Sequence, residues 1–477
     1  MQTADFTALT PLLLLAAAIA AVMLQIALKR SHILTIVLTL AGLIAAMLGV
    51  LAVGDMPARQ VTPLVTMDRL AFFFIGLILT ATAATALLGC RYWEHAVGQC
   101  EEYYLLLLVA ALGACVLAAA HHFAAFFIGL EILSISLFTL MAFARRRMAS
   151  VEAGLKYLVL AGISSAFLLF GIALIYADVG SLAFPIWTAR LQAAGETVSP
   201  LLLIGMGMTV IGVGFKLALV PFHMWTADIY QGAPAPTTAF VATVSKSAMV
   251  ALLLRLFAPV DFTAEPALFW TLAILAFASM IVGNILALRQ DSVKRILAYS
   301  SIAHMGYLLV AFLSGGPAAI AATVFYITAY TITVLGAFGV VTVLSRTDAD
   351  ADSMSDFQGL FFSHPWLAGV FMAMLLSLAG IPLTAGFIGK FYAITAGAQG
   401  GIWWLIITLV LTSAASLFYY LRIVVAMFSP PLENKTQPPA AGISYSGGLV
   451  LTVMTVLLIW VGSAPGPLID LIGRITQ

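Results

Sequence analysis

Apolar residues recur along this chain in long uninterrupted runs that are separated by short polar segments. A helix rises about 1.5 Å per residue, so roughly 20 apolar residues are enough to cross the hydrocarbon layer of a bilayer. About fourteen such runs can be read, at residues 8–28, 33–53, 68–90, 103–120, 122–143, 155–177, 201–221, 236–258, 266–288, 295–314, 317–345, 365–397, 403–428 and 446–464. The pattern predicts an all-α polytopic membrane protein with about fourteen transmembrane helices.

The composition agrees with a location in lipid. Hydrophobic residues make up 63% of the 477 residues, charged residues only 9%, and the mean hydropathy is +1.10. These values are far from those of a soluble domain. The net charge of +1 gives no reason to expect nucleic acid as a partner.

Basic residues between the runs predict the orientation, because the cytoplasmic loops of membrane proteins are enriched in lysine and arginine. With residue 1 placed outside, thirteen basic residues fall on inward connections: Lys29, Arg30, Arg91, Arg145, Arg146, Arg147, Lys156, Arg289, Lys294, Arg295, Arg346, Arg422 and Lys435. Four fall outside: Arg59, Arg69, Arg190 and Arg474. Both termini are therefore expected on the periplasmic side of a bacterial plasma (inner) membrane.

The order of the runs predicts an internal repeat. Runs 4–8 and 9–13 form two units of five helices, and because five is odd, the second unit enters the membrane from the opposite side. We therefore expect an N-terminal three-helix segment at 1–100 and a first antiporter-like unit at 101–258. A second, inverted unit follows at 259–428, and a C-terminal loop with the last helix occupies 429–477.

A proline lies inside the fourth helix of each unit. Pro221 is in the seventh run and Pro382 in the twelfth. Proline removes a backbone donor and clashes with the carbonyl four residues earlier, so both helices are expected to be broken. Broken helices persist at membrane depth where the freed backbone groups are buried in protein or line a hydrated cavity.

Five titratable residues lie inside the runs. They are Glu131, Lys216, Lys246, His304 and Lys390. A charge at bilayer depth costs at least ~2.5–3.5 kcal/mol on insertion scales, and such residues commonly mark ion or proton paths. Burial disfavours the charged form and a nearby opposite charge favours it, so neighbouring groups can exchange protons as a coupled set. We interpret the five residues as a candidate proton relay.

Each of these residues also has a purely structural interpretation. Glu131 and Lys216 could form a buried ion pair that only fixes helix packing. Lys246 and Lys390 could extend toward the membrane surface, and His304 could be a hydrogen-bonded packing residue. Arg145, Arg146 and Arg147 read as an orientation signal, and Asp348, Asp350, Asp352 and Asp356 as a solvated inner loop.

The cysteines exclude one class of chemistry. Cys90, Cys100 and Cys115 contain no C-x-x-C pair, so neither an iron–sulfur cluster nor a zinc site is expected in this chain. No other cofactor-binding motif is present in the expected structural context, so none of the chain's own residues is predicted to carry electrons.

Several motifs in fixed order resemble one family, the antiporter-like subunits of the proton-pumping NADH–quinone oxidoreductase, respiratory complex I. The matching segments are Gly129–Glu131, Glu152–Tyr157, Phe215–Thr238, Asp291–Ser301 and Gly380–Phe391, within about residues 100–430. Two features separate the chain from siblings in the family. It ends at Gln477 with no long lateral helix, unlike the L-type, and it has Lys390 where the M-type typically has glutamate.

The resemblance implies roles for the matching residues. It implies that Glu131 and Lys216 form a pair, that Lys246 is the central relay residue and that Lys390 lies on the exit side. It also implies that NADH, FMN, the iron–sulfur clusters and the quinone site belong to other subunits, with sibling antiporter-like chains as neighbours. The expected function is proton translocation coupled to electron transfer elsewhere in the complex.

Two other classes stay open from the sequence. A subunit of a multi-chain sodium/proton antiporter, or of a membrane-bound hydrogenase, would share the fold and the interior lysines. A structural membrane scaffold would tolerate neutral substitutions throughout the row of titratable residues.

Overall fold

The computed structural model describes residues 2–94, 99–194, 198–262, 264–346, 348–430 and 444–475. Within them, thirteen helical segments are long and apolar enough to cross a membrane. They are α2 (Thr10–Leu28), α3 (His32–Val53), α4 (Arg69–Glu94), α5 (Glu101–Ala119), α6 (Phe123–Met141), α7 (Met148–Val179), α9 (Pro200–Leu217), the continuous segment Ala235–Phe257, α13 (Pro266–Leu288), α14 (Val293–Leu313), α15 (Gly316–Leu344), α20 (Trp403–Phe428) and α21 (Tyr445–Ser463). The predicted all-α membrane fold is confirmed.

The remaining elements are short. The segment Ala235–Phe257 consists of α11 (Ala235–Phe240), a π-helical turn η1 (Val241–Ser245) and α12 (Lys246–Phe257). The other short helices are α1 (Thr3–Ala8), α8 (Phe184–Ala194), α10 (Met224–Gly232), α16 (Met354–Phe357), α17 (Leu360–Ser363), α18 (Pro365–Ala379), α19 (Ala385–Gln399) and α22 (Gly466–Gly473). Strands β1 (Arg59–Thr62) and β2 (Val65–Met67) form an antiparallel hairpin.

The predicted twelfth run, 365–397, is two helices rather than one span. α18 ends at Ala379, and α19 begins at Ala385 on the far side of Pro382. Gly380 takes a left-handed conformation with a φ of 89°, which ends α18 at little steric cost because glycine has no Cβ. The prediction of a helix break here is correct.

The seventh span is broken in the same manner. α9 ends at Leu217, the next residue Ala218 is left-handed, and α10 begins at Met224 beyond Pro221. The indole Nε1 of Trp225 donates a hydrogen bond to the carbonyl of Phe215 at 3.0 Å. A carbonyl left free by the end of α9 is thereby satisfied inside the protein, as a buried break requires.

Glycines allow two pairs of helices to pack with their backbones almost in contact. A Cβ added to Gly113 on α5 would lie 2.8 Å from the carbonyl oxygen of Gly129 on α6. A Cβ added to Gly306 on α14 would lie 2.8 Å from the carbonyl oxygen of Ala276 on α13. The first two helices of each predicted unit therefore form the same close hairpin, as small residues permit in membrane proteins.

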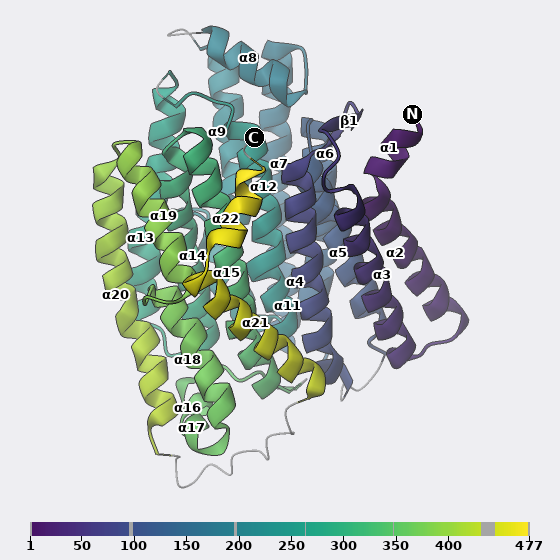
Figure 1. Cartoon of the computed structure of the whole chain (residues 1–477), viewed down its shortest axis with the longest axis vertical. Helices are drawn as coiled ribbons and strands as arrows, with labels where there is room; N and C mark the ends of the chain where they lie inside the picture. The colour runs from purple at the N-terminus through teal and green to yellow at the C-terminus, as the bar shows by residue number, and fades with distance from the viewer. Residues whose placement is uncertain are drawn as a thin grey trace.

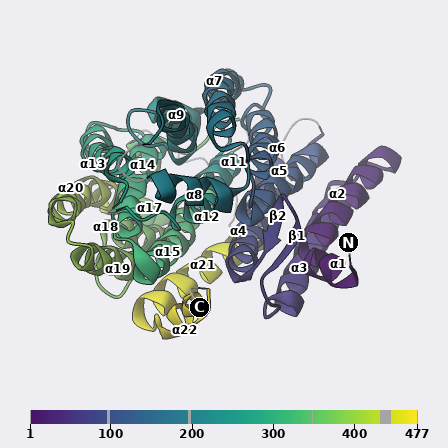
Figure 2. The same ribbon diagram turned by 90° about the horizontal axis from the view of Figure 1, so that it is seen from above.

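The helices that carry the candidate residues form the centre of the molecule. Almost all residues of α12, α14 and α15 are buried, whereas only a minority of the residues of α2 and α3 are buried within the chain. Figure 2 shows α2 and α3 at one edge, and α12, α14 and α15 in the interior. The two termini lie at the same end of the bundle, together with α8 and the hairpin (Figure 1). The segment 431–443, which includes Lys435, falls outside the described residues.

Candidate functional site: a row of buried lysines and hydroxyls

All three candidate lysines and the histidine are buried. Lys216, Lys246, His304 and Lys390 are 2, 1, 4 and 5% exposed, respectively. These low values exclude the interpretation that Lys246 or Lys390 extends to the membrane surface.

Lys216 lies in the last turn of α9, directly before the break. Its ammonium nitrogen Nζ donates to Ser134 Oγ on α6 at 2.6 Å and to Tyr157 OH on α7 at 2.8 Å. The same nitrogen is 4.9 Å from the centre of the Tyr157 ring. The neighbouring helices α6 and α7 therefore enclose the ammonium on α9 with two hydroxyl groups and an aromatic face.

Glu131 does not form the expected direct ion pair with Lys216. Among the described residues, no acidic oxygen lies within 4.0 Å of Lys216, and the Glu131 carboxylate instead accepts a hydrogen bond from Ser165 Oγ at 2.5 Å. The hydroxyl of Ser134, one helical turn after Glu131, lies beside the Lys216 ammonium, where a paired carboxylate would be expected. Glu131 is still close enough to Lys216 for an electrostatic interaction.

Lys246 begins α12, directly after the π-helical turn η1. Single π-turns inside α-helices are frequently found at functional sites. The ammonium donates to the Ser301 hydroxyl on α14, and that hydroxyl is hydrogen-bonded to Tyr330 OH on α15 at 2.5 Å. Lys246 is thus linked to α14 and α15 through two successive hydroxyl groups.

His304 follows Ser301 by three residues on α14, so both side chains share one face of the helix. Its Nδ1 is 2.8 Å from Tyr326 OH, and its Nε2 is 3.4 Å from Tyr420 OH. Tyr330 lies next to the imidazole, with 5.7 Å between ring centres. A cavity of about 10 Å³ lined by His304, Tyr326, Ser377, Leu378 and other residues lies beside the ring. It is large enough for about one water molecule.

Lys390 lies on α19, beyond the break, and points back to the end of α18. Its ammonium donates to the carbonyls of Leu378 at 2.7 Å and Ala379 at 2.9 Å, and to Ser413 Oγ on α20 at 2.7 Å. A cation at the C-terminus of a helix is favoured by the helix dipole and by the free carbonyls there. Lys390 therefore caps the broken helix.

Tyr230, on α10, supplies a hydroxyl between the Lys216 and Lys246 clusters. It lies near Tyr157, Ser301 and Tyr330. Its hydroxyl is buried and has no hydrogen-bond partner among the described residues. Buried polar groups normally have a partner, so an orphaned hydroxyl at this place needs an explanation.

A second buried cluster was missed by the sequence interpretation. Lys294 donates to Asp350 Oδ2 at 2.7 Å, and Arg147 donates to both Asp350 oxygens at 3.0 and 3.2 Å. Tyr92 OH also donates to Asp350, at 2.8 Å. The expectation of a solvated loop is therefore wrong for Asp350, whose side chain is 2% exposed, and Arg147 is more than an orientation signal.

The charges around Asp350 determine its ionisation. Burial alone would raise the pKa of this carboxyl, but Lys294 and Arg147 hold the pKa below its ordinary value. Asp350 is therefore an anion between two cations at neutral pH. Lys294 also donates to the carbonyls of Gln231 and Ala233 at the end of α10, at 2.9 and 2.7 Å.

In the described part of the chain, no three His, Cys, Asp or Glu side chains come together as a group that could hold a metal ion. The hydroxyl partners of the lysines were not identified from the sequence either. Serines and tyrosines in apolar helices were the available signal, but a single sequence does not show which of them face a lysine on another helix.

The fold and the row of buried lysines define an antiporter-like membrane subunit. Residues 120–416 match the family model described as NADH:quinone oxidoreductase/Mrp antiporter, TM. The chain belongs to this family.

A related sequence identifies the kind of subunit within this family. The chain is 48% identical over 484 residues to NADH-quinone oxidoreductase subunit N of Nitrosospira multiformis, covering 98% of this chain and 96% of that protein. Within the family, the chain belongs with subunit N of NADH-quinone oxidoreductase.

One solved structure agrees with this assignment, and two others share the fold alone. A chain of respiratory complex I from Thermus thermophilus, with bound aureothin, matches with a TM-score of 0.82 and 34% identity over 96% of this chain and 98% of that one. The Mrp complex of Dietzia sp. shares the fold at 20% identity, with a TM-score of 0.87 over 100% of this chain and 97% of that one. The archaeal membrane-bound sulfane sulfur reductase does so at 24% identity, with a TM-score of 0.85 over 99% and 97%.

Proposed function

We propose that this chain translocates protons in the membrane arm of an NADH–quinone oxidoreductase, through Glu131, Lys216, Lys246, His304 and Lys390. The observation that carries the proposal is the alternation of buried lysines with hydroxyl and imidazole groups across the centre of the molecule. Each hydroxyl and the neutral imidazole can both donate and accept a hydrogen bond, so a proton can enter such a group on one side and leave on the other.

The chemistry that drives the relay belongs to other subunits. In this proposal NADH is oxidised and quinone reduced by chains that hold FMN and iron–sulfur clusters, and sibling antiporter-like subunits lie beside this chain. The proposed location is a bacterial plasma membrane, with both termini on the periplasmic side. Electron transfer is coupled to the relay through charge interactions between neighbouring subunits.

We also propose that residues 101–258 and 259–428 are the two inverted units. The matching glycine-packed hairpins, α5 with α6 and α13 with α14, support this division. The helix breaks at Pro221 and Pro382 give further support, because each lies in the fourth helix of its unit. A lysine lies next to each break, Lys216 before the first and Lys390 after the second.

Substitution of the first cluster tests the function. Lys216→Ala or Glu131→Ala is expected to lower both proton pumping and NADH:quinone turnover several-fold, because coupled steps stop together. Both rates are measured in membrane vesicles that contain the assembled complex. Lys29→Ala is the control, since Lys29 is exposed and lies outside the row. Unchanged rates in an assembled Lys216→Ala complex would contradict the assignment, and sodium-dependent proton flux without NADH would favour an antiporter.

A further inference from the structure

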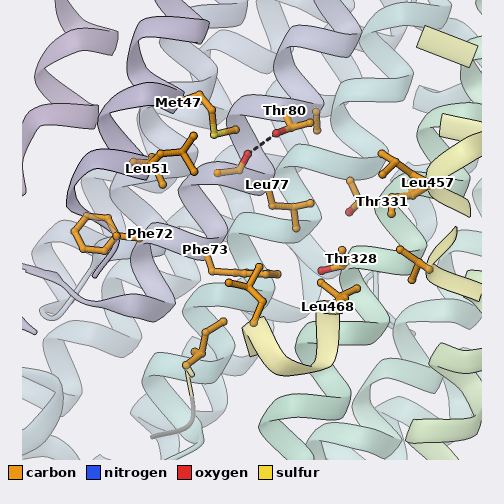
Figure 3. Close-up of a pocket in the computed structure, with 18 of the residues that line it drawn as sticks. Met47, Leu51, Phe72, Phe73, Leu77, Thr80, Thr328, Thr331, Leu457 and Leu468 are labelled. Carbon is orange, nitrogen blue, oxygen red and sulfur yellow. Dashed lines mark hydrogen bonds between the residues drawn. The ribbon is translucent and has the colours of Figure 1, made fainter. Parts of the chain in front are cut away.

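A large cavity lies outside the proposed relay, between α3, α4, α15, α21 and α22. Its volume is about 540 Å³, within the range of small-molecule sites. Figure 3 shows its walls, which are mainly apolar and include Leu51, Phe72, Phe73, Leu77, Leu457 and Leu468. Leu51 and Trp460 are exposed at the apolar outer surface, so the cavity is accessible from the lipid.

The charged residues of the cavity lining are Asp55, Arg69 and Arg474, and the two arginines lie together at one end. Arg69 Nη1 donates to the backbone carbonyl of Arg474 at 2.9 Å. Neither guanidinium forms an ion pair within 4.0 Å in the described parts of the chain. Asp55 is the acidic residue of the lining, so two cations and one anion leave a net charge of +1. This end is expected to attract an anionic group.

We propose that the cavity binds an anionic diacyl phospholipid, with its phosphate at Arg69 and Arg474 and its acyl chains along the apolar walls. Arginine binds phosphate oxygens in a bidentate manner, and basic pockets between membrane helices are suited to phospholipid headgroups. A free phosphate would leave the apolar walls uncovered, and a quinone tail would leave the arginines without an anion. The net positive charge favours phosphatidylglycerol over a zwitterionic lipid.

A lipid bound in the cavity would also contact α15 close to the Lys246 cluster. Thr331 on α15 lines the cavity, and its hydroxyl is 3.0 Å from Ser247 Oγ, next to Lys246. The preceding residue, Tyr330, bonds to the Ser301 partner of Lys246. A bound acyl chain would therefore hold α15 against the Lys246 cluster. This consequence rests on the proposed function, whereas lipid binding itself does not.

Photolabelling of the purified complex tests the proposal. Phosphatidylglycerol with a photoreactive group in its acyl chain is added after mild delipidation, and labelled peptides are mapped by mass spectrometry. Labelling of α4, α15 and α21 is expected. Gly76→Leu should reduce it several-fold, because a Cβ at Gly76 has its nearest neighbours 3.9 Å away and points into the cavity region. Gly162→Leu is the control, since Gly162 has no atom within 4 Å of its Cβ position.

The headgroup is tested separately. Arg69→Gln with Arg474→Gln should remove the preference for phosphatidylglycerol over phosphatidylcholine, while Arg190→Gln, on α8 at the same end of the molecule, should not. Equal labelling by the two lipids in the unmodified complex would overturn the proposal, as would labelling that Gly76→Leu does not change. Cross-links from these helices to a neighbouring subunit would also overturn it. If only the proposed proton relay were wrong, photolabelling by the lipid would be normal and NADH:quinone turnover would be unaffected in Lys216→Ala.

Discussion

At the scale of single residues, hydroxyl groups bind Lys216 and Lys246, and at Lys216 they lie where the carboxylate of Glu131 was expected. Ser134 and Tyr157 bind Lys216, and Ser301 binds Lys246. A direct carboxylate partner would hold the ammonium strongly in its charged form. Hydroxyls give hydrogen bonds without a full negative charge, so they satisfy the buried lysine and leave its proton easier to move.

Tyr230→Phe separates a transport role from a structural one. Removing a buried hydroxyl that has no partner is expected to leave stability unchanged or slightly higher. If that hydroxyl links the Lys216 and Lys246 clusters, turnover and proton pumping should fall several-fold. Thermal stability of the complex and coupled turnover are measured on the same preparation.

The chain offers a matched control for this substitution. Tyr103 on α5 also has a buried hydroxyl without a hydrogen-bond partner in the described residues, and it lies among Trp93, Tyr104 and Phe143, away from the relay. Tyr103→Phe should leave turnover unchanged. A normal rate in Tyr230→Phe would show that protons do not need this hydroxyl.

The interior lysines could be predicted from the sequence because a charge in an apolar run is visible locally. Their partners could not be predicted in the same way. Ser134 and Lys216 are 82 residues apart, and Lys246 and Ser301 are 55 apart. These contacts depend on how the helices pack, and serines are too common in the chain for their type to identify them.

At the scale of elements, backbone packing positions the relay helices. The α5–α6 crossing leaves no space for a side chain at Gly113, whose added Cβ would lie 2.6 Å from the Leu133 nitrogen. Ser134, the partner of Lys216, follows directly on α6. The distance between α5 and α6 therefore contributes to the position of the Ser134 hydroxyl.

Gly113→Ala is expected to lower the stability of the chain in the complex by about 1–3 kcal/mol, the usual cost of overpacking. The new methyl group would meet backbone atoms, which cannot rotate away. The melting temperature of the purified complex measures the effect. Gly162→Ala, where the added Cβ would meet no atom within 4 Å, should not be destabilising, and equal melting temperatures for the two variants would contradict this account of the crossing.

Span length and hydropathy were sufficient to predict most helices. Hydropathy alone shows run 365–397 as one span, but Pro382 correctly predicted its division into α18 and α19. The β1–β2 hairpin and α8 were missed, because both lie between apolar runs, where hydropathy carries no signal for secondary structure.

At the scale of the whole molecule, the Asp350 cluster joins distant parts of the chain. Asp350 contacts residues 258, 203 and 56 positions earlier, namely Tyr92, Arg147 and Lys294. The carboxylate thus connects the end of α4, the start of α7 and the start of α14. A pattern of acidic residues in a loop gave no indication that one of them would be buried in this manner.

Asp350→Asn should destabilise the chain by about 3–5 kcal/mol, because the buried Lys294 and the partly buried Arg147 lose their counter-charge. The pKa of Asp350 lies below its unfolded value of ~3.9, so its stabilising effect is complete above that pH and is lost as the pH falls through the folded value. The difference in melting temperature between the two proteins should therefore be constant from about pH 5 to 8.

Asp348→Asn is the matched control, since Asp348 lies two residues away and is exposed. It should melt like the unmodified protein. If the difference in melting temperature between Asp350→Asn and the unmodified protein disappeared within the range of pH 5 to 8, the Asp350 carboxylate would not be a permanent anion in the folded state.

The cap on α18 has a further consequence when its donors are counted. An ammonium has three N–H groups, and Lys390 uses all three, on Leu378, Ala379 and Ser413. A neutral amine has two N–H groups and a lone pair, so after loss of the proton both carbonyls keep a donor only if the Ser413 hydroxyl, which now donates to the carbonyl of Ala379, turns to donate to the nitrogen. Lys216 has two partners, both hydroxyls, and can lose a proton without leaving a carbonyl unpaired. At Lys390, the departure of one proton therefore requires either a reversal of the Ser413 hydrogen bond or the loss of a donor at the end of α18.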